Sequence, residues 1–481
     1  MSQADFGLIG LAVMGQNLVL NIADNGYQVA VFNRTVSKVD DFIQGPAKGF
    51  SVTGTHTLEE FIKTLKRPRK VMLMVKAGDA VDQFIEKIVP LLEEGDIIID
   101  GGNSKFTDTQ RRYETLKEKK ILFIGTGISG GEEGARHGPS IMPGGHPDAW
   151  PHVKEIFQKI AAKSEDGEPC CDWVGEGGAG HYVKMVHNGI EYGDMQLISE
   201  AYDLLRHGAN LELDMLSHVF DKYNKGALDS YLIEITAKIL STKDSSGKFM
   251  IDQILDVAGQ KGTGKWTAIS ALDKDMPLTL IAEAVYARNL SSFKEERQIA
   301  NKVYNKKTKK IEDDSFIDHL ENALYASKIM SYAQGFMLMR KASEEFSWKL
   351  NFGSIALMWR GGCIIRSKFL ADIKKAYDKN KDLKNLLLDD FFKEAIIKAE
   401  SGLRKVVSEA VLVGIGVPCL SAALSFFDGY TRANLPANMI QAQRDFFGAH
   451  TYERVDQKRG EYFHFDWMGD KKEHSSKTYN V

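Results

Sequence analysis

Short apolar runs alternate with longer mixed segments over the N-terminal third of the chain. The runs cover residues 6–9, 29–32, 71–75, 97–99 and 121–124. Apolar runs of this length are typical of strands that are buried on both faces of a sheet. The segments between them, such as 14–24 and 80–92, have the length and polarity of helices. Alternating strand and helix predicts a parallel, doubly wound α/β sheet.

The pattern changes at a glycine cluster, Gly-Glu-Gly-Gly-Ala-Gly, at residues 175–180. Such a flexible cluster suits a domain boundary. Beyond it, long segments such as 181–206 and 321–345 have helical character, whereas the stretch from Leu435 is rich in polar, charged and aromatic residues. We therefore expect an α/β domain over 1–177, a large all-α domain over 178–434, and an extended C-terminal tail over 435–481.

A glycine-containing turn follows the first predicted strand and precedes a helix, which is the context that a dinucleotide site requires. The turn consists of Gly10, Leu11, Ala12, Val13, Met14 and Gly15. Gly10 permits a tight turn and Gly15 permits close helix–strand packing, while the helix that begins near Val13 directs its free N–H groups at a pyrophosphate. Ala12 replaces the middle glycine of the usual G-x-G-x-x-G pattern, so a βα turn without a ligand stays an alternative.

The end of the second predicted strand indicates which dinucleotide would bind. It reads Asn33, Arg34 and Thr35, without the carboxylate that binds the ribose 2′-hydroxyl in NAD-specific sites. Arg34 can form charge-assisted hydrogen bonds with a 2′-phosphate, and Asn33 and Thr35 can add neutral ones. These residues favour NADP over NAD, against the alternative that Arg34 lies in a solvated loop.

Two further strand ends are expected in the same crevice. Val75, Lys76 and Ala77 follow the third apolar run, and Asn103 follows the fourth. Ligands of open α/β sheets bind at the carboxyl ends of the strands, so Asn103 is expected near both cofactor and substrate. The N-terminal part is thus predicted to be a Rossmann-like, doubly wound domain.

Five polar residues follow the glycine cluster at helical spacing. They are Lys184, His187, Asn188, Glu191 and Tyr192. Positions i, i+3, i+4, i+7 and i+8 share one face of a helix. The stripe fits either a solvated face with a lysine–glutamate pair or a functional site, and its histidine and asparagine favour the functional site only slightly.

Composition and charge argue against several classes of protein. The chain of 481 residues is 43% hydrophobic and 26% charged, as in ordinary globular proteins. A net charge of −3 predicts no general affinity for nucleic acid or anionic membranes. Four cysteines are too few for a disulfide framework, and no cluster with metal-ligand spacing is present in the sequence.

Two segments bear on membranes and targeting. The apolar stretch 410–427 contains Gly414, Gly416 and Pro418, which predicts a buried helix–turn–helix rather than a membrane span. The N-terminus lacks a basic segment followed by an apolar one, so no secretory signal is expected. We expect a cytoplasmic protein.

Taken together, the motifs resemble those of the 6-phosphogluconate dehydrogenase family, the decarboxylating enzymes of the pentose phosphate pathway, over essentially the whole chain. The resemblance is carried by Gly-Leu-Ala-Val-Met-Gly at 10–15, Phe-Asn-Arg-Thr at 32–35, Asp-Gly-Gly-Asn at 100–103, Gly-Ile-Ser-Gly-Gly at 127–131, Lys-Met-Val-His-Asn-Gly-Ile-Glu-Tyr at 184–192, Lys-Gly-Thr-Gly-Lys-Trp at 261–266, Arg288, and Gln-Ala-Gln-Arg-Asp-Phe-Phe-Gly-Ala-His at 441–450. Ala12 fits this family's own version of the turn.

The resemblance implies oxidative decarboxylation of 6-phospho-D-gluconate to ribulose 5-phosphate and CO2, with reduction of NADP. It implies Lys184 as the general base and Glu191 as the acid that protonates the product carbon. Such a base needs a pKa of about 7–8 instead of about 10.4. The substrate-binding residues that it implies are Asn103, Ser129, Gly130, Gly131, His187, Asn188, Tyr192, Lys261, Arg288, Arg444 and His450.

The resemblance also implies that 178–434 is the substrate and dimerisation domain of a homodimer, in which Arg444 and His450 of the tail reach the neighbouring subunit's site. Two other functions stay open. A non-decarboxylating β-hydroxyacid dehydrogenase would share the cofactor domain and a catalytic lysine, but would not need Lys261, Arg288 and Arg444 for a phosphate. A catalytically inactive NADP-binding protein is the other alternative, and the presence of both Lys184 and Glu191 argues against it.

Overall fold

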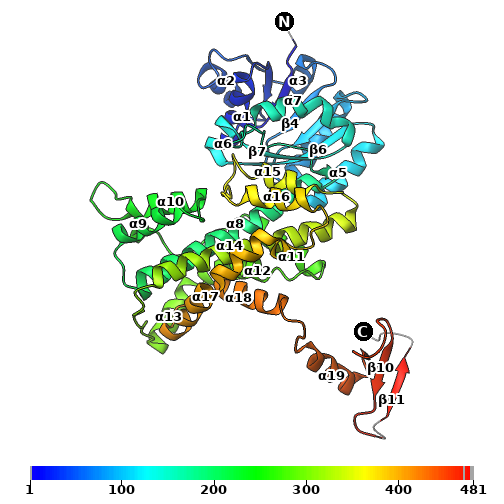
Figure 1. The fold of residues 1–481 in the computed structure, drawn as a ribbon. Helices are drawn as coiled ribbons and strands as arrows, with labels where there is room; N and C mark the ends of the chain where they lie inside the picture. The colour runs from blue at the N-terminus through cyan, green and yellow to red at the C-terminus, as the bar shows by residue number, and fades with distance from the viewer. Residues whose placement is uncertain (1–2, 470–471, 477–481) are drawn as a thin grey trace. The chain divides into compact units, whose positions relative to one another are not determined.

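A computed structural model describes residues 3–469 and 472–476 of the chain (Figure 1). The chain forms two compact units, residues 1–424 and 425–481, which are described separately. Two of the expectations fall partly outside the described residues. The N-terminal segment in which no secretory signal is expected loses residues 1–2, and the predicted tail loses residues 470–471 and 477–481. The two domain boundaries expected from the sequence, after residues 177 and 434, stay a prediction.

The first unit contains an eight-stranded sheet in the order β3-β2-β1-β4-β5-β6-β7-β8. Its strands are β1 (Phe6–Ile9), β2 (Val29–Phe32), β3 (Val52–Gly54), β4 (Lys70–Leu73), β5 (Ile97–Asp100), β6 (Leu122–Ser129), β7 (Ser140–Gly145) and β8 (Gly175–Glu176). Neighbouring strands are parallel, except that β6 and β7 are antiparallel. The predicted doubly wound α/β sheet is confirmed, with one antiparallel pair that the sequence did not indicate.

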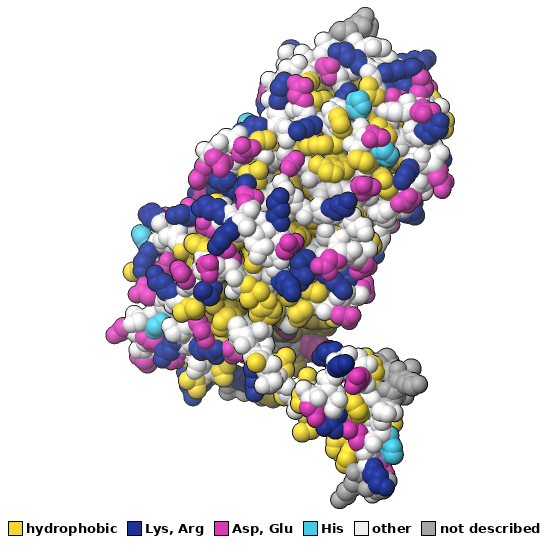
Figure 2. Space-filling view, turned by 45° about the vertical axis from the view of Figure 1, so that its right-hand side comes forward, with side chains coloured by type: hydrophobic (Ala, Val, Ile, Leu, Met, Phe, Trp, Pro, Cys, Tyr) yellow, Lys and Arg dark blue, Asp and Glu magenta, His cyan; other side chains and the backbone are white. Residues whose placement is uncertain are grey.

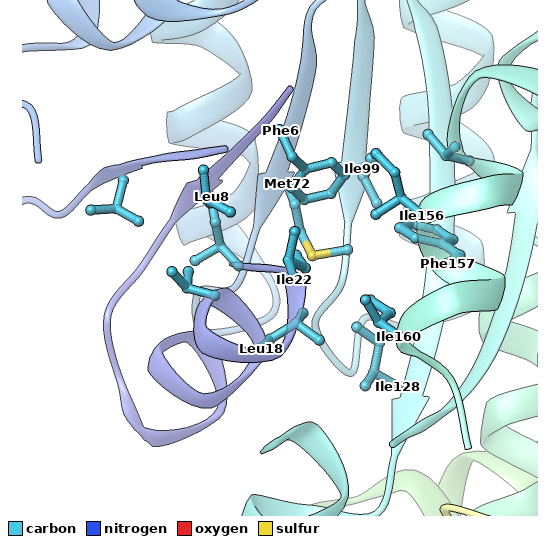
Figure 3. Close-up of a cluster of buried hydrophobic side chains, with 14 of the residues drawn as sticks. Phe6, Leu8, Leu18, Ile22, Met72, Ile99, Ile128, Ile156, Phe157 and Ile160 are labelled. Carbon is cyan, nitrogen blue, oxygen red and sulfur yellow. The ribbon is translucent and has the colours of Figure 1, made fainter. Parts of the chain in front are cut away.

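Helices cover both faces of this sheet. They are α1 (Val13–Asp24), α2 (Ser37–Gln44), α3 (Leu58–Thr64), α4 (Asp79–Ile88), α5 (Phe106–Glu118), α6 (Gly131–His137) and α7 (Trp150–Ile160). Met72 and Ile99 pack with side chains of α1, α2 and α7 in one core cluster (Figure 3). Leu73 and Ile98 are adjacent to Met72 and Ile99 on the same strands, and they pack with α3, α4 and α5 in a second cluster. Burial on both faces explains the continuous apolar runs.

The rest of the first unit is helical. Its helices are α8 (Ala179–Asp203), α9 (Leu213–Asn224), α10 (Tyr231–Ser241), α11 (Thr263–Asp273), α12 (Thr279–Ser291), α13 (Lys294–Tyr304), α14 (Phe316–Phe346), α15 (Phe352–Met358), α16 (Leu370–Lys379), α17 (Asp390–Val413) and α18 (Pro418–Tyr430), which ends in the second unit. The predicted all-α part is confirmed. The apolar stretch 410–427 forms the end of α17, a turn and most of α18, as expected.

Helix α8 is central to this helical part, because β6, β7, α11, α12 and α14 all pack against it. Its first turn lies so close to the sheet that a Cβ atom on Gly180 would fall 2.5 Å from the carbonyl oxygen of Met142. A helix enclosed in this way is buried on nearly every side. In the described part of the chain, no helix is long and apolar enough to cross a membrane.

The second unit has local structure that the expectation of an extended tail did not include. It contains α19 (Ala437–Gly448) and an antiparallel sheet of β9 (Tyr452–Glu453), β10 (Tyr462–Phe465) and β11 (Glu473–Ser476). The buried carboxylate of Asp445 accepts hydrogen bonds from Phe465 N at 3.1 Å and Trp467 Nε1 at 2.9 Å, and contacts His464 Nδ1 at 2.9 Å. This carboxylate therefore joins α19 to the sheet.

Candidate active site

The turn after β1 has the geometry of a phosphate cradle. Gly10 has a φ of +110°, and a Cβ atom there would overlap the carbonyl oxygen of Met74. A Cβ atom on Gly15 would overlap the carbonyl oxygen of Gly10, so only glycine allows this helix–strand contact. Helix α1 begins at Val13, as predicted, and no side chain caps its N-terminus. Its first N–H groups therefore remain available to an anion.

Three loops at the carboxyl ends of β1, β4 and β5 adjoin at this turn. A Cβ atom on Gly10 would lie 3.2 Å from Cγ1 of Val75, and one on Gly102 would lie 3.2 Å from the Val75 carbonyl oxygen. Asn33 ties the end of β2 to the turn, because its Oδ1 accepts a hydrogen bond from Leu11 N at 3.1 Å. The predicted cofactor residues are thus brought together at the carboxyl ends of the strands, at the switch point between β1 and β4.

Arg34 lies exposed beyond the end of β2. Its side chain forms no hydrogen bond or ion pair within residues 3–469 and 472–476. An unpaired guanidinium at this strand end, together with the cradle of Gly10 and Gly15, fits a dinucleotide that carries a 2′-phosphate.

The loop that presents Asn103 is shaped by a buried carboxylate. Asp100 accepts hydrogen bonds from Gly102 N at 3.1 Å, Ser104 Oγ at 2.6 Å and Arg112 Nη1 at 3.1 Å. Asn103 itself is exposed. The sequence analysis missed Arg112, because a charged residue in a predicted helix usually lies in solvent. The pairing of Asp100 and Arg112 could not be read from their positions in the chain.

His181 connects this loop to α8. Its Nε2 lies 2.9 Å from the Gly102 carbonyl oxygen, and its Nδ1 lies 2.7 Å from Thr109 Oγ1. Because the carbonyl oxygen is only an acceptor, Nε2 donates and Nδ1 accepts the Thr109 hydroxyl. These two contacts therefore fix the position of the loop that carries Asn103 relative to the polar stripe of α8.

Lys184 is buried, with 6% of its surface exposed. Its aliphatic chain lies on Gly127 of β6, where a Cβ atom would fall 2.5 Å from Cγ of the lysine. Burial lowers the pKa of Lys184 from 10.5 to about 8, although the nearby Glu191 carboxylate and Cys363 thiol oppose this shift. The pKa lies near the range that a general base needs at neutral pH.

His187 is fully buried and neutral. Burial lowers its pKa well below the usual value, and the Lys184 ammonium adds to this effect. Its Nδ1 lies 2.9 Å from Asn188 Oδ1, while Asn188 Nδ2 donates to Thr263 Oγ1 at 3.1 Å. His187 Nδ1 is therefore the protonated nitrogen, and Nε2 carries a lone pair.

Two buried polar atoms of the site lack a partner among the described residues: His187 Nε2 and Ser129 Oγ. Buried polar groups are normally hydrogen-bonded, so two such atoms in one predicted site indicate a polar ligand. Thr263 was not among the predicted residues, although its segment, Lys-Gly-Thr-Gly-Lys-Trp, was one of the motifs.

Glu191 and Tyr192 form the other end of the stripe, and Arg288 of α12 packs against it. The Arg288 guanidinium carbon lies 3.5 Å from the centre of the Tyr192 ring, and its Nη1 donates to the Gly259 carbonyl oxygen at 3.1 Å. Burial raises the pKa of Glu191, although Lys184 and Arg288 oppose this. Lys184, His187 and Tyr192 are all buried, so the alternative of a solvated helix face is wrong.

Ser129, Gly130 and Gly131 form the turn between β6 and α6. Both glycines have positive φ, +111° and +62°. A Cβ atom on Gly130 would fall 2.6 Å from the carbonyl oxygen of Gly362, and the ring of Trp359 lies 5.6 Å from that of His187. Residues 359–365 therefore form one side of the site. The sequence analysis missed this segment, although its Gly-Gly-Cys sequence could have drawn attention to it.

The remaining predicted residues lie on the surface of the first unit or in the second unit. Lys76 and Lys261 are exposed, and Lys261 stands two residues before Thr263. Arg444 and His450 lie in the second unit, on α19 and just after it, where Gln441 contacts both. All four cysteines are free and buried. Within the described ranges, no group of histidine, cysteine, aspartate and glutamate side chains could hold a metal ion.

Comparison with known proteins places this geometry in a family. Residues 5–175 match the NAD binding domain of 6-phosphogluconate dehydrogenase, and residues 180–467 match the C-terminal domain of 6-phosphogluconate dehydrogenase. The decarboxylating 6-phosphogluconate dehydrogenase of Mus musculus is 60% identical over 484 residues, covering 100% of both chains. That of Haemophilus influenzae is 59% identical over 481 residues, covering 100% of this chain and 99% of the relative.

A solved structure agrees with these relatives. The 6-phosphogluconate dehydrogenase of Plasmodium falciparum, described in its apo form and in complex with its cofactor NADP+ and its substrate 6-phosphogluconate, is 48% identical. The two folds superpose with a TM-score of 0.93 over 96% of this chain and 100% of that one. The chain therefore belongs to the 6-phosphogluconate dehydrogenase family.

Proposed function

We propose that this chain catalyses the oxidative decarboxylation of 6-phospho-D-gluconate to D-ribulose 5-phosphate and CO2, with NADP as the oxidant. The observation that carries the proposal is the buried Lys184, with a pKa of about 8, whose Nζ lies 3.5 Å from Nδ1 of His187, while Nε2 of the same ring has no partner among the described residues. Relatives named as decarboxylating enzymes favour this function over a non-decarboxylating dehydrogenase and over an inactive NADP-binding protein.

The cofactor residues form one binding surface. The turn from Gly10 to Gly15 would hold the pyrophosphate against the N-terminus of α1, and Arg34, with Asn33 and Thr35, would bind the 2′-phosphate. Val75, Lys76, Ala77 and Asn103 would line the nicotinamide side. When bound, NADP accepts a hydride from C3 of the substrate.

Lys184 acts as a base and then as an acid. Its neutral amine takes the proton of the C3 hydroxyl group as this carbon is oxidised. The resulting 3-keto acid has its carboxylate β to a carbonyl group. When the C1–C2 bond breaks, CO2 leaves and the electron pair forms an enolate, whose oxygen receives the proton back from Lys184. A pKa of about 8 suits both roles near neutral pH.

Glu191 supplies the last proton. Burial raises the pKa of this carboxyl group, which favours its protonated form. It donates a proton to the carbon that becomes C1 of the product, while the neutral Lys184 amine takes the proton of the adjacent enol hydroxyl group, so the enediol becomes a ketose. Lys184 and Glu191 stand seven positions apart on α8, roughly 10 Å along its axis, so they reach different carbons of an extended substrate.

The ends of the substrate carry two different anions. Ser129 Oγ and the N–H groups of Gly130 and Gly131 would bind the carboxylate end, while His187 Nε2, which carries a lone pair, would accept a hydrogen bond from a neighbouring substrate hydroxyl group. Asn188 fixes the tautomer of His187. The phosphate end would meet Tyr192, Lys261 and Arg288, with Arg444 and His450 supplied by a second subunit.

A homodimer fits the surface of both units. Large apolar side chains are exposed on α12, on α13 and between them: Tyr286, Leu290, Phe293, Ile299, Val303 and Tyr304. Others are exposed on α19: Met439, Ile440, Phe446 and Phe447. Figure 2 shows hydrophobic side chains that reach the surface in patches between charged ones. Exposed patches of this kind mark protein–protein contacts, and they support a tail that completes the neighbour's site. The cytoplasmic location stays a prediction.

The test is a coupled measurement of NADPH and CO2 from 6-phosphogluconate. We expect equal amounts of both products, and little activity with gluconate, which lacks the phosphate. Absence of NADPH would overturn the proposed function, and NADPH without CO2 would overturn the decarboxylation step. Sedimentation at several protein concentrations tests the dimer, which a monomer at all concentrations would contradict.

A further inference from the structure

A buried ion pair joins α8 to α14 at Asp194, about one helical turn beyond Glu191 along α8. Lys328 Nζ lies 2.5 Å from Asp194 Oδ2, and the two residues are 4% and 2% exposed. The helices lie side by side (Figure 1). Removing two charges from water is costly, and apolar residues often stabilise such a position as well or better. The pair therefore calls for an explanation beyond stability.

The explanation begins with Tyr332, one turn after Lys328 on α14. Lys328 Nζ lies 5.5 Å from the centre of the Tyr332 ring, which is fully buried. Burial and the neighbouring Asp194 carboxylate raise the pKa of Tyr332 well above its usual value, so its hydroxyl group keeps its proton. This hydroxyl donates a hydrogen bond to the Ile365 carbonyl oxygen at 2.9 Å.

Ile365 is at the end of the segment that walls the active site. Just before this segment, the Met358 carbonyl oxygen accepts a hydrogen bond from Ser140 Oγ at 2.7 Å, and in its middle the Gly362 carbonyl oxygen accepts one from Ser140 N at 2.8 Å. That same Gly362 oxygen faces Gly130. The segment is thus held by β7 at one end and receives the Tyr332 hydrogen bond at the other.

The position of this segment matters for two groups of the site. It closes over the turn of Ser129 and Gly130, which would bind the substrate carboxylate. It also carries Cys363, whose buried thiol is close enough to Lys184 for the two groups to influence each other electrostatically. A shift at Ile365 would move the wall that shapes this end of the site.

We propose that Tyr332, oriented by the Lys328–Asp194 pair, is a positioning residue that holds residues 359–365 against the carboxylate-binding turn. The proposal rests on the function proposed above. It assigns the shape of the substrate site to three buried polar residues that are not among the predicted site residues.

The central test variant is Tyr332→Phe, which removes only the hydroxyl group. Tyr223→Phe is a matched control, because Tyr223 is also fully buried and donates to a backbone carbonyl oxygen, that of Ile317, at 2.6 Å. Calorimetric titration of each protein with 6-phosphogluconate alone, and with NADP alone, gives readouts that do not depend on turnover.

We expect Tyr332→Phe to weaken 6-phosphogluconate binding about fivefold, the effect of one hydrogen bond, and to raise KM for this substrate by a similar factor. NADP affinity should stay unchanged. Tyr223→Phe should change thermal stability without changing either affinity. Unchanged 6-phosphogluconate affinity in Tyr332→Phe, or an equal loss in both variants, would overturn the proposal.

A second variant tests the ion pair itself. The double substitution Lys328→Met with Asp194→Leu removes both charges together, so no unpaired charge is left buried. We expect it to fold and to show the same loss of 6-phosphogluconate affinity as Tyr332→Phe. Wild-type affinity in a folded double variant would overturn the role of the pair. A wild-type protein that binds neither ligand would instead overturn the function on which the inference rests.

Discussion

The side chain of Lys184 lies directly on Gly127, so that a Cβ atom on Gly127 would fall 2.5 Å from Cγ of the lysine and would overlap its Cβ atom. The two residues come from β6 and α8, far apart in the chain. The absence of a side chain on the strand creates the space in which the lysine is buried. The lowered pKa of Lys184 thus depends on a glycine in the sheet.

Gly127→Ala should therefore displace Lys184 and reduce turnover roughly a hundredfold or more, since a displacement of about 1 Å can have an effect of this size. NADP affinity should be retained, because the cofactor turn is separate. Gly416→Ala is the control, as no atom lies within 4 Å of the added Cβ position. Near-normal kcat in Gly127→Ala would contradict the packing argument.

Lys184 should also reduce the stability of the folded protein near neutral pH. Its pKa is about 8 in the folded state and 10.5 for an ordinary lysine, so the folded state binds fewer protons between these values. Stability therefore rises as the pH rises from 8 to 10.5, and below pH 8 the full cost of about 3 kcal/mol is present.

Lys184→Met should accordingly increase the free energy of unfolding at neutral pH by up to about 3 kcal/mol while turnover is lost. Chemical denaturation at several pH values measures this. Lys119→Met, at an exposed lysine, should have little effect. A decrease in stability, or a gain that does not shrink with rising pH, would show that burial does not penalise the Lys184 charge.

Arg34 should determine the preference for NADP. Arg34→Gln removes a charge-assisted contact worth roughly 1.5–3 kcal/mol, so KM for NADP should rise roughly ten- to a hundredfold with little change in kcat. The preference over NAD should fall accordingly. Lys48→Gln, which removes another exposed charge, should leave both values unchanged. An unaltered NADP preference in Arg34→Gln would place the 2′-phosphate elsewhere.

Glu200 should make stability depend on pH in the opposite direction to Lys184. Its buried carboxylate accepts hydrogen bonds from Cys419 N at 2.8 Å and Leu420 N at 2.9 Å. Burial nevertheless raises its pKa from 4.5 to about 7. The folded state therefore holds the proton more tightly, and stability falls as the pH rises from 4.5 to 7.

Glu200→Gln should flatten this part of the stability curve, whatever its effect on stability at a single pH. Denaturation midpoints across this range measure the slope. Glu118→Gln changes an exposed carboxylate and should leave the slope as in the wild type. A slope that persists in Glu200→Gln would assign the pH dependence to other groups.

The strands that could be predicted from the sequence are those buried on both faces, such as β1, β2 and β5, because burial leaves a continuous apolar run. Strand β7, Ser-Ile-Met-Pro-Gly-Gly, was missed. Its glycines allow close backbone contact: a Cβ atom on Gly144 would fall 2.5 Å from Gly180 N. Small residues of this kind give no hydrophobic signal, although they are what lets α8 pack on the sheet.

The polar stripe of α8 could be predicted from helical spacing, but its burial could not. That property depends on β6, α11 and α14, which are distant in sequence. The same limit applies to residues 359–365 and to the Asp100–Arg112 pair. The Asp100–Arg112 pair has no local pattern, and the Gly-Gly-Cys sequence within 359–365 does not show what it contacts, since each acquires its role only when separate segments meet.

The most direct test of the account is a single-turnover experiment with Lys184→Ala and saturating NADP and 6-phosphogluconate, in which NADPH formation is followed in time. NADP binding to the same protein is measured separately by calorimetry. The account predicts normal NADP binding and almost no NADPH. NADPH formation at close to the wild-type rate would exclude Lys184 as the base and contradict the central claim.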